Sequence, residues 1–159
     1  MTTGTHEETR APVPESVTRD LAVSVFVVWR KQVLLHNHRK LGLWLPPGGH
    51  VEPNELPDDA AVREVLEEAG VEVNLVGDVA IDAPGPRQLI RPRGVQLESI
   101  SPGHEHIDLI YLARPIAGYA GALTSESTPF GWYGVAALQE LPLTPEMVAW
   151  ARLALNELA

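Results

Sequence analysis

Three glutamates on one predicted helix are the side chains of this chain best placed to do chemistry. Glu64, Glu67 and Glu68 are spaced at i, i+3 and i+4, so a helix brings them onto one face. Like charges at this spacing destabilise a helix by roughly 0.2–0.5 kcal/mol per pair. A hard divalent cation, which takes oxygen ligands, would account for such a cluster. The alternative is a solvated acidic face without a ligand.

The helix that carries these glutamates is expected over residues 57–69. Pro57 suits the first helical position, because the N–H that it lacks would have had no partner there. Gly70 is a good helix stop. Upstream, residues 44–49 read as a strand that runs into a Gly-Gly turn, where a backbone carbonyl can approach a metal or substrate. The apolar arc opposite the glutamates consists of Ala61, Val62, Val65, Leu66 and Ala69.

The stretch from Gly49 to Val71 resembles the Nudix box, G-x5-E-x7-R-E-U-x-E-E-x-G-U, in which U is an aliphatic residue. One departure is Leu56, where the family often has a capping Ser or Thr, a difference of about 1 kcal/mol. The resemblance implies an α/β fold, an α/β/α sandwich with a central mixed β-sheet. The fixed positions are all matched, by Gly49, Glu55, Arg63, Glu64, Val65, Glu67, Glu68, Gly70 and Val71.

The resemblance also implies metal-dependent hydrolysis of a pyrophosphate bond in a nucleoside diphosphate linked to another moiety. The implied cofactor is Mg²⁺, with Mn²⁺ as the alternative. Arg63 and Glu55 would then orient the metal-binding carboxylates, a role that metal sites generally require. Glu64, Glu67 and Glu68 are also the implied catalytic groups, with Glu64 sometimes proposed as the base. The implied metal ligands are Gly49 through its carbonyl, Glu64, Glu67 and Glu68.

A fourth acidic residue is implied by the same resemblance. Many family members place it on a loop about six residues before a tryptophan, and Glu126 stands six residues before Trp132. Glu126 is therefore a candidate catalytic ligand or base. Glu105 or Asp108 could fill this role instead.

Other side chains could contact a phosphorylated substrate. A basic run over residues 36–40 ends a predicted strand, and a loop over residues 83–94 carries three arginines, whose forks match phosphate oxygens. For each group the alternative is a solvated segment. The substrate-binding candidates are His38, Arg39, Glu52, Arg87, Arg91, Arg93, His106 and Asp108.

A strand predicted over residues 104–112 places His104, His106 and Asp108 on one face. Two imidazoles and a carboxylate at this spacing could bind a transition metal. They could also line the substrate cleft as polar walls, or serve as hydrogen-bonded strand residues. The sequence is compatible with a metal site, with a polar cleft wall and with a structural role for these residues.

The remaining elements form one predicted domain over residues 19–159, after a mobile tail over residues 1–18. Strands are expected over residues 21–29, from residue 33 onward, and over residues 71–81, the last as a strand or a bent pair. A short strand is expected at residues 132–133. Thr144 caps the last helix and Pro145 starts it. The apolar stripe of that helix consists of Met147, Trp150, Ala151, Ala154, Leu155 and Leu158.

The composition argues against several classes of function and of binding site. The formal net charge of −9 argues against nonspecific nucleic-acid binding, which needs a basic surface. The chain has no cysteine, which excludes disulfides and thiolate metal sites. No run approaches the roughly 20 apolar residues of a membrane span, and no signal peptide is present, so a cytoplasmic location is expected. The expected partner is a small nucleoside-diphosphate substrate, bound by a monomer or homodimer.

Two further functions are compared with the hydrolase. A Nudix-fold sensor would hold a nucleotide without cleaving it, but such domains commonly lose box glutamates, and this chain keeps them all. An isomerase of the isopentenyl diphosphate type relies on a catalytic cysteine, so the composition excludes it. The identity of the substrate is left open.

Overall fold

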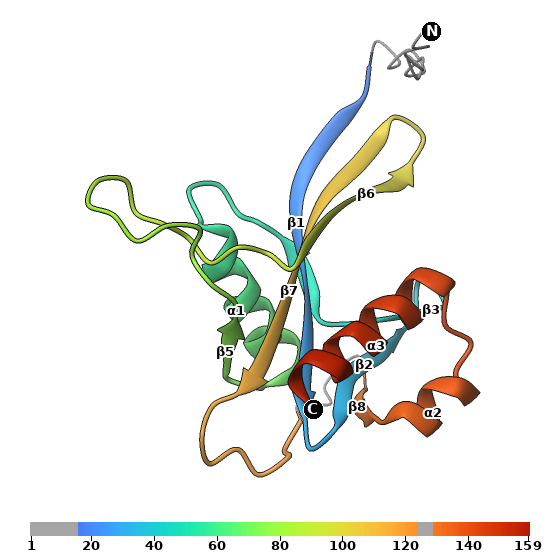
Figure 1. Cartoon of the computed structure of the whole chain (residues 1–159). Helices are drawn as coiled ribbons and strands as arrows, with labels where there is room; N and C mark the ends of the chain where they lie inside the picture. Colours follow the sequence, from blue (N-terminus) through green and yellow to red (C-terminus); the bar gives the residue numbers. More distant parts are fainter. Residues whose placement is uncertain (1–15, 124–128) are drawn as a thin grey trace, which may run out of the picture.

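The structure, a computed structural model, describes residues 16–123 and 129–159. Its two longest strands, β1 (Thr18–Trp29) and β7 (His104–Pro115), lie side by side through the centre of the molecule (Figure 1). The helices are α1 (Pro57–Ala69), α2 (Val135–Glu140) and α3 (Pro145–Leu158). The other strands are β2 (Gln32–His38), β3 (Leu43–Leu45), β4 (Gly48–His50), β5 (Val73–Val76), β6 (Gly94–Ser101) and β8 (Phe130–Tyr133).

The sheet is mixed, as predicted, because β1 runs parallel to β7 while the other pairings are antiparallel. The other edge of β1 is shared between two partners. At Val28 and Trp29 it pairs with β2, whereas at Ala22 to Ser24 it pairs with β4. The sheet therefore splits where β2 leaves β1, and the split opens a space over the middle of β1.

Alternation along β1 builds two cores, one on each face of the sheet. Val23, Val25 and Val27 belong to the core under α1. Phe26 and Val28 belong to the core under α3. Helices thus cover both faces, which confirms the predicted α/β/α sandwich (Figure 1).

The helix α1 has both predicted boundaries, and α3 begins where predicted. In α3, the side chain of Thr144 accepts a hydrogen bond from the Met147 N–H, and five of the six residues of the predicted apolar stripe are buried. In α1, the N-cap is Leu56, which makes no side-chain cap, and Gly70 ends the helix in the left-handed conformation. Leu66 departs from the predicted apolar arc, because its side chain points to solvent.

The segment around the two consecutive glycines corrects a prediction. Gly48 and Gly49 do not form a turn: they lie in β4 and pair with Ser24 and Val23 of β1. Both positions need glycine because a side chain would not fit against the neighbouring atoms. A Cβ on Gly48 would collide with the backbone carbonyl of Val23. The missing side chains let β4 lie tightly between β1 and α1.

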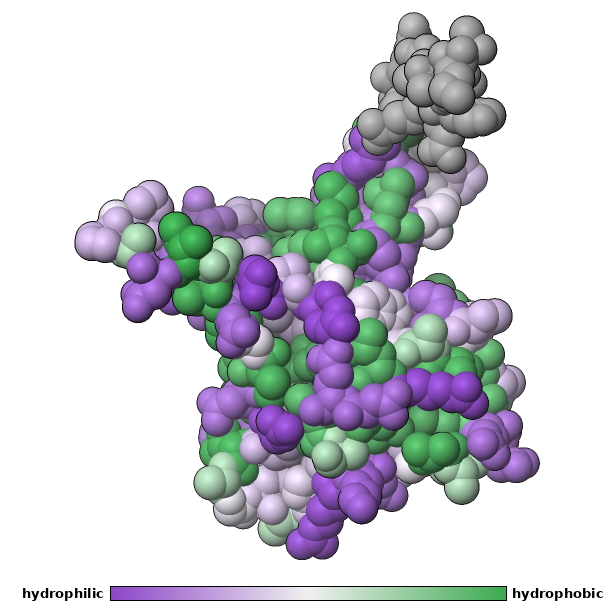
Figure 2. Space-filling view, viewed as in Figure 1, coloured by the Kyte–Doolittle hydropathy of each residue, from purple (hydrophilic) through white to green (hydrophobic). Residues whose placement is uncertain are grey.

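Two other strand predictions need correction. The strand expected over residues 71–81 is only four residues long, β5, and the chain beyond Val76 is irregular. A strand was not predicted over residues 94–101, where β6 pairs with β7. Its apolar residues Val95, Leu97 and Ile100 are exposed. Figure 2 shows hydrophobic residues at the surface of the arm that β1, β6 and β7 extend beyond the body. Within residues 16–123 and 129–159, no helix is long and apolar enough to span a bilayer.

Replacing Leu34 with alanine is expected to lower the free energy of unfolding by about 2–5 kcal/mol, because it leaves a cavity in the core. Leu34 is fully buried beneath α1. Leu66→Ala is the matched control, since Leu66 is 46% exposed, and its effect should stay within about 0.5 kcal/mol. Urea denaturation of both variants measures the difference. Equal losses would contradict this packing.

Candidate active site

The box glutamates come together where the C-terminal half of α1 packs against β4. Glu64 is half-buried, with a side chain 14% exposed, whereas that of Glu67 is 58% exposed. The Gly48 N–H donates a 2.8 Å hydrogen bond to Glu68 Oε1. The predicted acidic face is therefore turned partly toward the sheet, and it is not a fully solvated surface.

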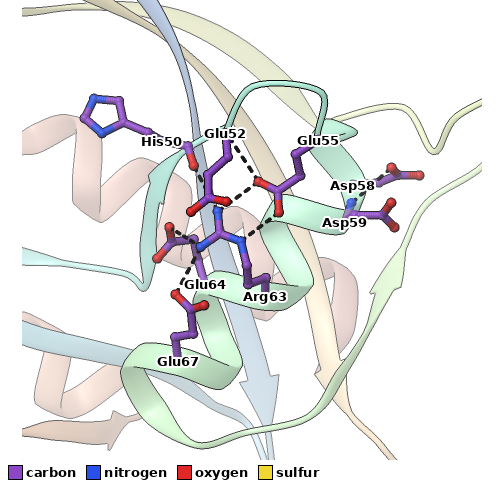
Figure 3. Close-up of polar contacts among 8 residues, drawn as sticks. All are labelled: His50, Glu52, Glu55, Asp58, Asp59, Arg63, Glu64 and Glu67. Carbon is purple, nitrogen blue, oxygen red and sulfur yellow. Dashed lines mark hydrogen bonds and ion pairs between the residues drawn. The ribbon is translucent and has the colours of Figure 1, made fainter.

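Arg63 holds this group together (Figure 3). Its Nε donates to Glu55 Oε2 at 2.7 Å, and its Nη2 donates to Glu55 Oε1 at 2.9 Å. Its Nη1 donates to Glu64 Oε1 at 2.9 Å and to Glu67 Oε2 at 3.0 Å. Nη2 also reaches the backbone carbonyl of His50 at 3.1 Å. One guanidinium thus links the loop before α1, two box glutamates and β4.

The surroundings shift the pKa values of four side chains in this group: Glu55, Arg63, Glu64 and Glu68. Burial raises the pKa of Glu64 and raises that of Glu68 to about 7. The hydrogen bonds from Arg63 lower the pKa of Glu55, and those to Glu55 raise the pKa of Arg63. Arg63 therefore favours the ionised form of Glu55, whereas burial disfavours the ionised forms of Glu64 and Glu68.

This donor set fits a hard divalent cation. Carboxylate oxygens are the ligands that Mg²⁺ and Mn²⁺ prefer, and the raised pKa values show that added positive charge would be favourable here. A Cβ on Gly49 would lie 2.5 Å from Glu64 Oε1, so only glycine leaves room for the carboxylate against the backbone. Glu64, Glu67, Glu68 and the Gly49 carbonyl are the residues that would hold the ion.

A pocket of about 320 Å³ opens beside the glutamates, where β2 separates from β1. Its lining includes Ser24 and Phe26 of β1, and Glu68 of α1. Its lining within residues 16–123 and 129–159 includes no lysine or arginine. The other polar lining residues are His36, His38, His50, Glu98, His106, Asp108 and Glu146.

Two polar atoms of pocket residues are buried without a hydrogen-bond partner among the described residues: His36 Nδ1 and Asp108 Oδ1. Burial, with a smaller contribution from His38, lowers the pKa of His36 to about 4, so its ring is neutral. The ring stacks on Phe130 with centroids 4.2 Å apart. A polar ligand in the pocket could supply the partners that these atoms lack.

Asp108 is 3% exposed, and its Oδ2 accepts a 2.8 Å hydrogen bond from the Ser24 hydroxyl. Burial, followed by the neighbouring carboxylates of Glu98 and Glu146, raises the pKa of Asp108 to about 7. Near neutral pH this side chain can be a carboxylic acid, which donates a hydrogen bond as well as accepting one.

Asp108→Asn is expected to stabilise the protein at pH 8 by up to about 4 kcal/mol, since the pKa rises from 3.8 to about 7 and one pKa unit corresponds to about 1.36 kcal/mol. Between the ordinary value of 3.8 and the folded value of about 7, the unfolded state ionises while the folded state keeps its proton. Wild-type stability therefore falls as the pH rises through this window, and asparagine removes that loss.

Thermal unfolding at pH 4 and pH 8 measures this effect. The advantage of Asp108→Asn should be present at pH 8 and disappear at pH 4. Asp82→Asn, at an exposed loop position, is the control and should show no such pH dependence. An equal effect of Asp108→Asn at both pH values would contradict the raised pKa.

The structure brings some substrate-binding candidates to this pocket and leaves others away from it. His38, His106 and Asp108 line the pocket, and Glu52 lines a shallower groove beside the box. Arg39 is exposed on the turn after β2. Glu126 lies outside the described residues.

None of the three loop arginines lines either cavity in the described part of the chain. Arg87 and Arg91 are exposed on the loop before β6. Arg93 Nη2 forms a 2.7 Å ion pair with Glu157 of α3. Glu105, an alternative to Glu126, pairs with Arg19 at 2.9 Å.

Sequence reasoning missed Ser24, His36, Glu98 and Glu146 as pocket residues. Glu98 belongs to β6, and the alternation of Val95, Leu97 and polar residues in that segment was an available signal. Glu146 follows the helix start at Pro145 and reaches the pocket only because α3 crosses the sheet there. Nothing in the sequence alone indicates that contact.

Comparison with known proteins gives a family and a fold. The model of the NUDIX domain matches residues 18–154. A solved structure of a NUDIX-family hydrolase from Clostridium perfringens superposes with a TM-score of 0.78 and 37% identity, covering 90% of this chain and 100% of that one. The structure of a MutT NUDIX hydrolase from Burkholderia pseudomallei, at 22% identity and a TM-score of 0.60, is similar in fold.

Curated relatives match over a shorter stretch. The diphosphoinositol polyphosphate phosphohydrolase 3-alpha of Mus musculus is 43% identical over 70 residues, 43% of each chain. A putative 8-oxo-dGTP diphosphatase of Bacillus subtilis is 41% identical over 51 residues, 32% of this chain and 34% of that protein. The match thus spans less than half the length of these relatives.

Proposed function

Because the chain belongs to the NUDIX domain family, we propose that it hydrolyses a pyrophosphate bond in a nucleoside diphosphate linked to another moiety. The observation that carries the proposal is the complete acidic group beside Gly49: Glu64 and Glu68 lie against β4, and Arg63 bonds to both Glu64 and Glu67. A sensor that only binds nucleotides would not need this whole set.

In the proposed reaction, different residues of the chain would bind the ion, orient its ligands and accept a proton. When bound, Mg²⁺ or Mn²⁺ would neutralise phosphate charge and lower the pKa of a bound water. Arg63 orients Glu64 and Glu67, and the Gly48 N–H orients Glu68. A glutamate that is not fully used in binding the ion can accept the proton of the attacking water.

The pocket supports a nucleoside in preference to a polyphosphorylated ring. Glu98 and Glu146 give it negative charge, and its described lining has no cationic lysine or arginine, so several phosphates would be repelled there. A nucleobase is neutral and carries both donors and acceptors. It could satisfy His36 Nδ1 and Asp108 Oδ1, the buried atoms of the pocket that have no partner among the described residues.

The test is product release from a panel of compounds, assayed with Mg²⁺, with Mn²⁺ and after removal of metal by a chelator. The panel holds nucleoside triphosphates, including an 8-oxo purine, a nucleotide sugar, ADP-ribose and a diphosphoinositol polyphosphate. We expect metal-dependent turnover of a nucleoside compound and little turnover of the inositol compound.

The other outcomes are equally informative. Preferred cleavage of the inositol compound would overturn the nucleoside assignment while keeping the phosphoanhydride chemistry. Nucleotide binding by calorimetry without turnover of any compound would favour the sensor, and the catalytic roles would then be withdrawn.

A further inference from the structure

A second group of potential metal ligands lies outside the box glutamates. Asp20, His50, His104 and His106 each offer one ligand atom, and these atoms all lie within 4.8 Å of one another. They come from three neighbouring strands, β1, β4 and β7. We propose that these four residues bind a transition-metal ion of the Zn²⁺ class, separately from any ion on the glutamates and independently of the proposed hydrolase activity.

The spacing suits a four-coordinate ion. With bonds of about 2.0–2.1 Å, the ligand atoms of a tetrahedral zinc site are roughly 3.3–3.4 Å apart. His50 Nε2 lies 3.1 Å from His106 Nε2 and 3.7 Å from Asp20 Oδ2. His104 Nε2 lies 3.4 Å from the same Asp20 oxygen. Small side-chain rotations would therefore complete the site.

The sheet holds these side chains in place. Asp20 is opposite His106 in the parallel pairing of β1 with β7, and His50 is opposite Ala22 on the other edge of β1. The His104 Nδ1 is hydrogen-bonded to the Thr18 hydroxyl at 2.9 Å, which leaves Nε2 for a metal. Such a partner on the second ring nitrogen is a common feature of metal-binding histidines.

The donor chemistry distinguishes this site from the carboxylate site. Three imidazoles and one carboxylate suit Zn²⁺, Co²⁺ or Ni²⁺, whereas Mg²⁺ prefers oxygen ligands throughout. Figure 3 shows the His50 ring pointing away from Arg63, Glu64 and Glu67, although its backbone carbonyl accepts from Arg63. Asp108, expected beside the two β7 histidines, is instead bonded to Ser24 and is not among the four ligands.

The four ligand residues lie where an ion would hold the strands around the pocket entrance together. His50 and His106 line the pocket, and Asp20 and His50 line the groove beside the box. An ion would join the end of β4 to β1 and β7, so it would fix the entrance of the pocket relative to the arm. The ion would also link segments far apart in sequence, since Asp20 precedes the box and His104 and His106 follow it.

Titration with Co²⁺ in excess Mg²⁺ tests the proposal on the full chain. Mg²⁺ occupies the oxygen site, and four-coordinate Co²⁺ gives far stronger visible absorption than six-coordinate Co²⁺. We expect one equivalent of Co²⁺ with strong bands, displaced by Zn²⁺. His104→Gln and His106→Gln should each weaken Co²⁺ binding by at least about 10-fold, whereas His38→Gln, at an imidazole outside the group, and Glu68→Gln should not.

Circular dichroism checks that each variant is folded. Should a histidine variant not fold, Asp20→Asn at an exposed position must still weaken binding if the site is real. The proposal is overturned by the absence of strong bands in the wild type, by unchanged bands in the folded variants, or by loss of the bands in Glu68→Gln.

Discussion

Glu68→Gln is expected to reduce metal-dependent turnover by about 100-fold or more, with the fold intact. Removing an outer partner of a metal site costs about 10–100-fold, and Glu68 is a proposed ligand itself. Glutamine keeps the size of the side chain and can still accept the 2.8 Å hydrogen bond from Gly48. It cannot supply the negative charge that a cation requires. The loss should therefore appear in activity and metal affinity, without a loss of stability.

The measurement is kcat over a range of Mg²⁺ concentrations, with calorimetric titration of Mn²⁺ and thermal unfolding of the same sample. Glu67→Gln should behave alike, because Glu67 is also a proposed ligand. Glu72→Gln is the matched control, since Glu72 is exposed just beyond α1. Turnover by Glu68→Gln close to that of Glu72→Gln would remove Glu68 from the proposed ligands.

Arg63→Lys is expected to weaken apparent metal affinity by about 10–100-fold, as loss of an orienting partner does. Lysine keeps the charge, but it cannot bind Glu55 through two parallel hydrogen bonds while also reaching Glu64. We also expect a stability loss of about 1–3 kcal/mol, because charged hydrogen bonds are broken around partly buried carboxylates.

A positioning role predicts a specific kinetic pattern for Arg63→Lys. High Mg²⁺ should restore much of the turnover, because excess ion compensates for poorly aligned ligands. Arg152→Lys, on the exposed side of α3, is the control and should match the wild type. A kcat loss that no Mg²⁺ concentration relieves would argue instead that Arg63 contacts the substrate directly.

The features predicted most accurately from the sequence are those that neighbouring residues determine. Pro57 and Gly70 bound α1, and Thr144 with Pro145 starts α3, because caps and breakers act on their immediate neighbours. The box glutamates lie together for the same reason, since helical spacing alone puts them on one face.

Features that depend on distant neighbours were predicted less well. The strand β6 alternates in sequence, but its apolar residues Val95 and Leu97 are exposed, so the face that this alternation predicts to be buried is not part of a core. Gly48 and Gly49 resembled a turn because their need for space arises only when β1 and Glu64 lie against them.

Likewise, Asp20 could not be joined with His104 and His106 until the register of β1 with β7 was known. Strand alternation had grouped Asp108 with these two histidines. His106 and Asp108 do line the same pocket, but Asp108 is bonded to the Ser24 hydroxyl and is not one of the four clustered ligand residues.

The pairing of β1 with β7 has a consequence for how the chain is made. Thr18 meets His104 across a sequence separation of 86 residues. At about 5–20 residues per second, the ribosome needs roughly 4–17 s to extend the nascent chain that far. During that interval the apolar stretch around Val25 has no parallel partner. A chaperone that holds extended apolar segments would thus be most useful to this protein before β7 is synthesised.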